Sequence, residues 1–183
     1  MIAKMPKADE MQANYYGQVS LRATYPDGQG AGETRTLVCV ATKGVESKPA
    51  AQVAKMTLAA VEGAKYAVQA RFANIGNVHF KPKSRAVVVT GQGQSVTEIE
   101  LAGEEGLMLP LETREFSGVV DFEKVEPGEY ALKVTMDCGS GQGAAERMPL
   151  RVSIEEGRKV VTITKQQAAT STAPASQAAE PGK

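Results

Sequence analysis

Apolar and polar residues alternate with a period of two along much of this chain. The segment after the Pro127-Gly128 turn shows the pattern most clearly. Its apolar positions fall on one face and Glu129, Ala131, Lys133, Thr135 and Asp137 on the other. This alternation is typical of a strand with one side in a core and the other in water. The segment therefore predicts an antiparallel β protein with these residues in its core: Tyr130, Leu132, Val134, Met136 and Cys138.

Seven or so short strands of this kind are expected from Val53 to Thr164, separated by turn signals at intervals of about 8–12 residues. The segment 53–61 also has helical propensity, but the alternation of Met56, Leu58 and Ala60 favours a strand. No helical pattern of 10–15 residues alternates with the strands, which argues against a parallel α/β sheet. The predicted fold is all-β: an immunoglobulin-like antiparallel β-sandwich of two sheets. The other expected strands are 65–73, 78–80, 86–90, 96–101, 114–122, 130–138, 148–154 and 159–164.

Two further strands, 16–25 and 34–42, precede the sandwich and predict a β-hairpin with a long, turn-rich loop. A two-stranded hairpin is marginal alone in water, and its uncovered edges recruit other strands. We therefore expect a partner-binding edge here, and pairing with another chain. Its apolar residues are Val19, Leu21, Tyr25, Leu37, Val38 and Val40.

The expected organisation has three parts. Residues 1–48 form a polar leader and the accessory hairpin. Residues 50–165 form the sandwich, after a short linker at 43–49. Residues 166–183 hold no apolar side chain larger than Ala and are predicted to be disordered.

The composition disfavours several partners. Among 183 residues, 21 Lys and Arg balance 21 Asp and Glu, so no net charge indicates nucleic acid or an anionic membrane as partner. No apolar run approaches the ~20 residues of a transmembrane helix. The first 16 residues contain no apolar signal-peptide core, so the chain is expected in the cytoplasm if its start is genuine.

Candidate catalytic chemistry is sparse. His79 is the sole histidine, so no histidine-based triad or dyad is available, and we expect it to be a turn residue with a local hydrogen bond. Asn74 and Asn77 are interpreted as turn residues that tolerate a left-handed backbone. The many carboxylates lack calcium-loop spacing and are expected on the solvent-exposed faces of strands and turns. We expect no enzyme, cofactor or metal; a carboxylate hydrolase is the least favoured alternative. The basic cluster Lys81, Lys83 and Arg85 is interpreted as a guard against edge-to-edge pairing.

Two cysteines, Cys39 and Cys138, leave two alternatives open. They form an inter-sheet disulfide in an oxidising compartment, or they are two buried thiols that act as small apolar residues.

Three short motifs together resemble a known family. They are Asn74-Ile75-Gly76-Asn77 with His79, then Leu109-Pro110, and Pro127-Gly128-Glu129-Tyr130. The span from about Ala51 to Ile163 resembles the C-terminal immunoglobulin-like domain of bacterial cell-envelope proteins. Those proteins are two-domain sandwiches related in layout to the periplasmic chaperones of pilus assembly.

This resemblance implies a location in the periplasm or at the cell surface, and a non-enzymatic protein-interaction module that acts through sheet edges. The alternative is a structural or adhesin-like spacer domain. The resemblance also implies that residues 1–48 hold the remnant of a preceding β domain, whose last strands correspond to Tyr16–Thr42. The secretion signal of the family has no counterpart here, so the sequence is interpreted as an N-terminally truncated or degenerate relative. The implied partner is another protein, or a second copy of the chain.

Overall fold

The computed structural model describes residues 14–24, 31–139 and 143–164. Tyr25 and the tail 166–183 lie outside these ranges. All regular structure within them is β-strand, and they contain no helix that could span a membrane. The strands are β1 (Asn14–Thr24), β2 (Ala31–Ala41), β3 (Ala51–Glu62), β4 (Lys65–Asn74), β5 (Lys83–Thr90), β6 (Ser95–Gly103), β7 (Thr113–Asp121), β8 (Gly128–Asp137), β9 (Gly143–Glu155) and β10 (Arg158–Ile163).

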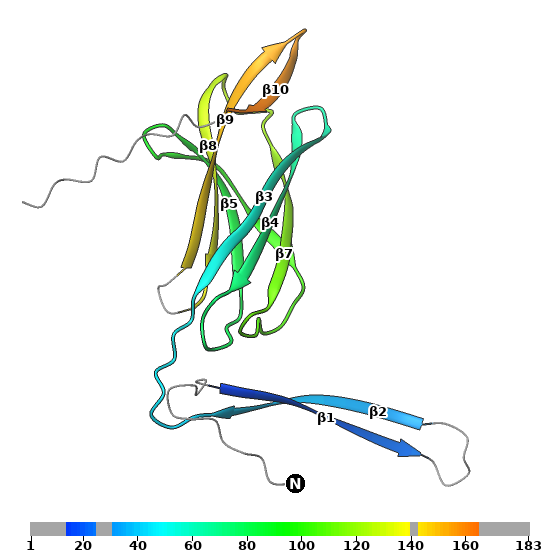
Figure 1. Cartoon of the computed structure of the whole chain (residues 1–183). Helices are drawn as coiled ribbons and strands as arrows, with labels where there is room; N and C mark the ends of the chain where they lie inside the picture. The colour runs from blue at the N-terminus through cyan, green and yellow to red at the C-terminus, as the bar shows by residue number, and fades with distance from the viewer. Residues whose placement is uncertain (1–13, 25–30, 140–142, 165–183) are drawn as a thin grey trace, which may run out of the picture.

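Strands β3 to β10 form an antiparallel sandwich of two layers (Figure 1). One layer has the order β3-β4-β7 and the other the order β6-β5-β8-β9-β10. Strand β6 pairs with β5 along most of its length, but its last residues, Ala102 and Gly103, pair with β7. The first, second and fifth strands of the sandwich thus face the third, sixth and seventh. This is the strand order of immunoglobulin-like sandwiches, so the predicted fold class is confirmed.

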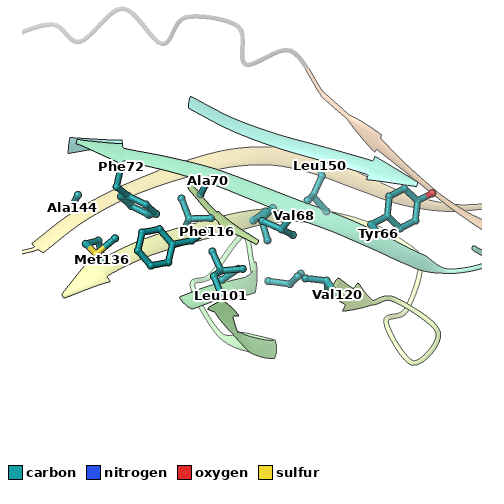
Figure 2. Packing of buried hydrophobic residues seen from close by; sticks show 14 of the residues in the cluster. Tyr66, Val68, Ala70, Phe72, Leu101, Phe116, Val120, Met136, Ala144 and Leu150 are labelled. Carbon is teal, nitrogen blue, oxygen red and sulfur yellow. The ribbon is translucent and has the colours of Figure 1, made fainter. Parts of the chain in front are cut away.

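The core lies between the two layers and is built from alternate residues of each strand (Figure 2). Strand β4 buries Tyr66, Val68, Ala70 and Phe72 in strict alternation, because every second side chain points into the sandwich. Aromatic rings meet edge to face, with the centroids of Phe72 and Phe116 5.9 Å apart. From the opposite layer, strand β8 contributes Leu132, Val134 and Met136, and Cys138 follows it.

Tyr130 differs from the other expected core residues of β8 because it is only partly buried. Its hydroxyl donates a hydrogen bond of 2.9 Å to the carbonyl of Glu126, four residues upstream. A tyrosine near the start of the sixth strand, bonded back to the preceding turn, is the tyrosine corner of immunoglobulin-like sandwiches. A polar atom of Tyr130 must therefore stay at the rim of the core.

One strand prediction is confirmed and one is wrong. The segment 53–61 is a strand, as predicted, because Ala51–Glu62 pairs along β4. The expected strand 78–80 is only an isolated bridge between Phe80 and Met108. Ile154 lies in a strand with Leu150 and Val152, as predicted, but it is exposed, because β9 and β10 continue beyond the body of the sandwich (Figure 1).

Strands β1 and β2 form a separate two-stranded sheet with unbroken pairing from Asn14–Ala41 to Thr24–Ala31. We call this pair the hairpin. It lies across one end of the sandwich, below the turn that joins β4 to β5 (Figure 1). Within the described residues neither outer edge of the hairpin has a neighbouring strand.

Candidate protein-interaction surface

The two faces of the hairpin differ in chemistry. The register places Gly17 opposite Val38, Val19 opposite Thr36 and Leu21 opposite Thr34. Side chains of directly paired residues lie on the same side of a sheet. One face, which we call the apolar face, therefore carries Tyr15, Gly17, Val19, Leu21, Ala23, Gly32, Thr34, Thr36, Val38 and Val40. The described charged residues of the hairpin, Arg22, Glu33 and Arg35, all lie on the other face.

Most of the apolar face is uncovered, but Tyr15 at its base is partly buried and its hydroxyl is enclosed without a hydrogen-bond partner among the described residues. The exposed fractions are 44 % for Val19, 62 % for Leu21, 40 % for Val38 and 59 % for Val40. The structure thus gathers four of the six predicted binding residues on one surface. Leu37, with 48 % exposure, lies on the opposite face beside Gln18. Tyr25 lies outside the described residues.

Tyr16 fixes the direction in which the apolar face points. Its hydroxyl accepts a hydrogen bond of 2.9 Å from the backbone N–H of His79 and lies 2.8 Å from Nδ1 of the same residue. Tyr16 is on the face that carries the charges, so this face is turned toward the sandwich at the base of the hairpin. At this point the apolar face is consequently turned away from the sandwich.

The Tyr16–His79 contact corrects the expectation of a local hydrogen bond for His79, because the two residues are 63 positions apart. Their rings meet edge to face with centroids 5.5 Å apart. Burial raises the pKa of the Tyr16 hydroxyl, and the nearby Cys39 thiol adds to this effect, whereas the hydrogen bond from the His79 backbone opposes it. The neutral hydroxyl can donate its hydrogen to Nδ1 while it accepts from the N–H.

The Asn-Ile-Gly-Asn turn after β4 holds the linker between the hairpin and the sandwich. The Asn77 side chain accepts from the N–H of Lys48 at 2.7 Å and donates to the carbonyl of Glu46 at 2.9 Å. Gly76 lies so close to the linker that a Cβ atom would come within 2.6 Å of the Ala50 nitrogen. The turn therefore fixes the position of the linker where it enters the sandwich.

Neither asparagine of this turn has the left-handed backbone predicted for it. Asn74 is buried, and its amide donates to the carbonyls of Val78 and Met108, both at 3.0 Å. Asn74 nevertheless has the local role that the sequence predicted, because its side-chain oxygen accepts from the N–H of Gly76 at 2.9 Å and Val78 is only four residues away. The partners of Asn77 are instead supplied by the linker, which is distant in sequence.

The loop beside this turn contains a residue with a strained backbone. Leu111 has a φ of 66° and a side chain that is 90 % exposed, and its N–H donates to the carbonyl of Asn74 at 2.9 Å. The loop that carries it is braced by the buried Arg114, which bonds to Glu112 at 2.5 Å and to the Glu104 and Leu107 carbonyls. The left-handed conformation of Leu111 is thus imposed by its surroundings.

A hollow with a volume of about 1290 Å³ lies at the same end of the sandwich. Lys81, just before β5, and Lys83 and Arg85 on β5 border it, as do Glu98 and Glu100 on β6. Arg85 is paired with Glu98 at 2.9 Å. Across residues 14–24, 31–139 and 143–164, no three His, Cys, Asp or Glu side chains are grouped so that they could hold a metal ion.

The two cysteines are not bridged. Cys138 is buried, as the thiol alternative predicted, and burial, followed by the charge of Asp137, raises the pKa of its thiol. Cys39 is exposed, so the prediction of two buried thiols is wrong for it. Its position on a two-stranded sheet with no covering layer explains its exposure.

Comparisons with known proteins show likeness to solved β structures only. No family model and no curated protein matches the chain. The CARDB domain of the PF1109 protein from Pyrococcus furiosus, solved with di-metal ions, is 12% identical, with a TM-score of 0.36 over 55% of this chain and 85% of that one. Two structures of β-glucosidase from Kluyveromyces marxianus are also 12% identical, with TM-scores of 0.34 and 0.35. They cover 56% and 64% of this chain, but only 14% and 15% of the enzyme. A likeness at this level does not extend to activity.

Proposed function

We propose that this protein is a non-enzymatic interaction module that binds another polypeptide through its hairpin. One observation carries the proposal: an apolar, uncharged sheet face lies uncovered and is turned away from the sandwich. A sheet with one apolar face normally packs against a second layer. The two unpaired edges of the hairpin add backbone groups that can bond to a further strand.

The finer proposal is a pilus-chaperone-like module of the bacterial cell envelope. It rests on the resemblance of the Asn-Ile-Gly-Asn, Leu-Pro and Pro-Gly-Glu-Tyr motifs, and the immunoglobulin-like order of the sandwich is compatible with it. We assign no reaction to the chain, because His79 is engaged in holding the hairpin and the hollow beside β5 is bordered by a paired Arg85 and Glu98.

Neighbouring residues on opposite faces of the hairpin provide the test. Immobilised wild-type chain, Leu37→Glu and Val38→Glu are each exposed to a cell extract of the source organism, and retained proteins are identified by mass spectrometry. We expect the wild type and Leu37→Glu to retain the same protein and Val38→Glu to lose it.

Val19→Thr is a second variant of the apolar face that keeps a β-branched strand residue. It should weaken retention without unfolding the hairpin. Equal retention by Leu37→Glu and Val38→Glu, or a wild type that neither retains another protein nor associates with itself, would overturn the proposal.

A further inference from the structure

The most informative residue of the apolar face is Gly17, an interior residue of β1. Glycine weakens a strand interior, and its presence there often marks a bulge or the close approach of another backbone. The register of β1 and β2 contains no bulge, and Gly17 has no left-handed φ. A Cβ atom at this position would meet nothing within 4 Å. The described residues of this chain therefore give no reason for a glycine here.

We infer that the apolar face of the hairpin binds the same face of a second copy of this chain. The inference rests on the proposed function, whose partner it names. Gly17 leaves a recess beside Val38, and two sheets that pack at about 10 Å need small residues opposite large ones. A valine or leucine of the second copy fills this recess.

The charge distribution favours a symmetric contact. In an interface with two-fold symmetry the same patch of both copies meets itself, so a patch with charges of one sign would repel its copy. The apolar face carries no ionisable group besides Tyr15, since Arg22, Glu33 and Arg35 lie on the other side. Two such faces can meet without burying an unpaired charge.

The surface area that two hairpins can bury against each other indicates a weak association. Strands of 11 residues rise about 3.4 Å per residue and lie about 4.8 Å apart, so the hairpin offers a footprint of about 350–400 Å². Two copies then bury roughly 700–800 Å², below the about 1,200–2,000 Å² of stable complexes. Contacts of this size are typical of weak, transient encounters, so we expect the pairing to be reversible.

Sedimentation velocity on the full chain tests the inference, at concentrations from about 5 to 500 µM. We expect the sedimentation coefficient of the wild type to rise with concentration, and the rise to persist in Leu37→Glu and vanish in Val38→Glu. Gly17→Val fills the recess with a residue that favours strands, so it should strengthen the hairpin and weaken association at least tenfold. Ser20→Val adds the same side chain to the opposite face and is the matched control.

Two results would overturn the inference: a monomeric wild type over the whole range, or association that Gly17→Val and Val38→Glu leave unchanged. A monomer that still retains a foreign protein, with loss only in Val38→Glu, would overturn self-association and leave the proposed function standing. Association without any retained foreign protein supports the second copy as the partner.

Discussion

Replacing Gly76 by alanine should disrupt the close contact between the Asn-Ile-Gly-Asn turn and the linker. The added Cβ would lie 2.6 Å from the Ala50 nitrogen and would also meet the Lys48 carbonyl, and both are backbone atoms that cannot rotate away. Real Cβ atoms do not approach this closely, so the turn or the linker must shift. Such a shift endangers the bonds from the Ile75 and Gly76 N–H groups to Ala50, at 3.0 and 3.2 Å. Overpacking of this kind costs about 1–3 kcal/mol, and each lost hydrogen bond adds about 1 kcal/mol.

Urea unfolding of Gly76→Ala should therefore show a free energy of unfolding about 2–4 kcal/mol below that of the wild type. Gly91→Ala is the control, since its added Cβ meets nothing within 4 Å and its backbone is not left-handed. That substitution should be neutral or stabilise by up to about 1 kcal/mol, because it reduces the freedom of the unfolded chain. If both variants shift the unfolding midpoint equally, the close approach at Gly76 has no energetic consequence and the reasoning is wrong.

Three further predictions concern the sandwich and its surface. Leu132→Ala should lower the free energy of unfolding by about 2–5 kcal/mol, because Leu132 is fully buried, whereas Lys133→Ala should change it by less than about 1 kcal/mol; equal losses in urea unfolding would contradict the alternation of β8. Leu111→Gly should raise the free energy of unfolding by up to about 1 kcal/mol, since it relieves a left-handed backbone and removes little packing. Glu156→Gly, at the other left-handed non-glycine residue of the described chain, should raise it in the same way. A lower free energy of unfolding in either variant would refute the strain. Thiol labelling of the native protein should modify Cys39 quickly and Cys138 only after unfolding, and equal rates would show that Cys138 is accessible.

The strands of the sandwich were largely predictable from the sequence because one face of each strand is buried. Alternation in β4 and β8 directly records which side chains enter the core. Ile154 follows the same alternation but is exposed, since the sequence carries no sign of where β9 leaves its covering layer.

The candidate surface was predictable only in part. A continuous apolar run from Leu37 to Val40 hides the fact that Leu37 and Val38 lie on opposite faces, and the register with β1 resolves it. The Tyr16–His79 and Asn77–linker contacts join residues that are far apart in sequence, and no local pattern encodes such pairs. For this reason both His79 and Asn77 were assigned local roles.

The solitary histidine gives the molecule an internal reporter. Since the sequence holds one imidazole, its ring protons produce a single isolated set of NMR signals, and His79 lies where the hairpin contacts the sandwich. The ring current of Tyr16, whose centroid is 5.5 Å away, displaces these signals as long as the two rings are in contact. Loss of this contact, on binding of a partner or on a change of solvent, can thus be followed at one resonance without a label.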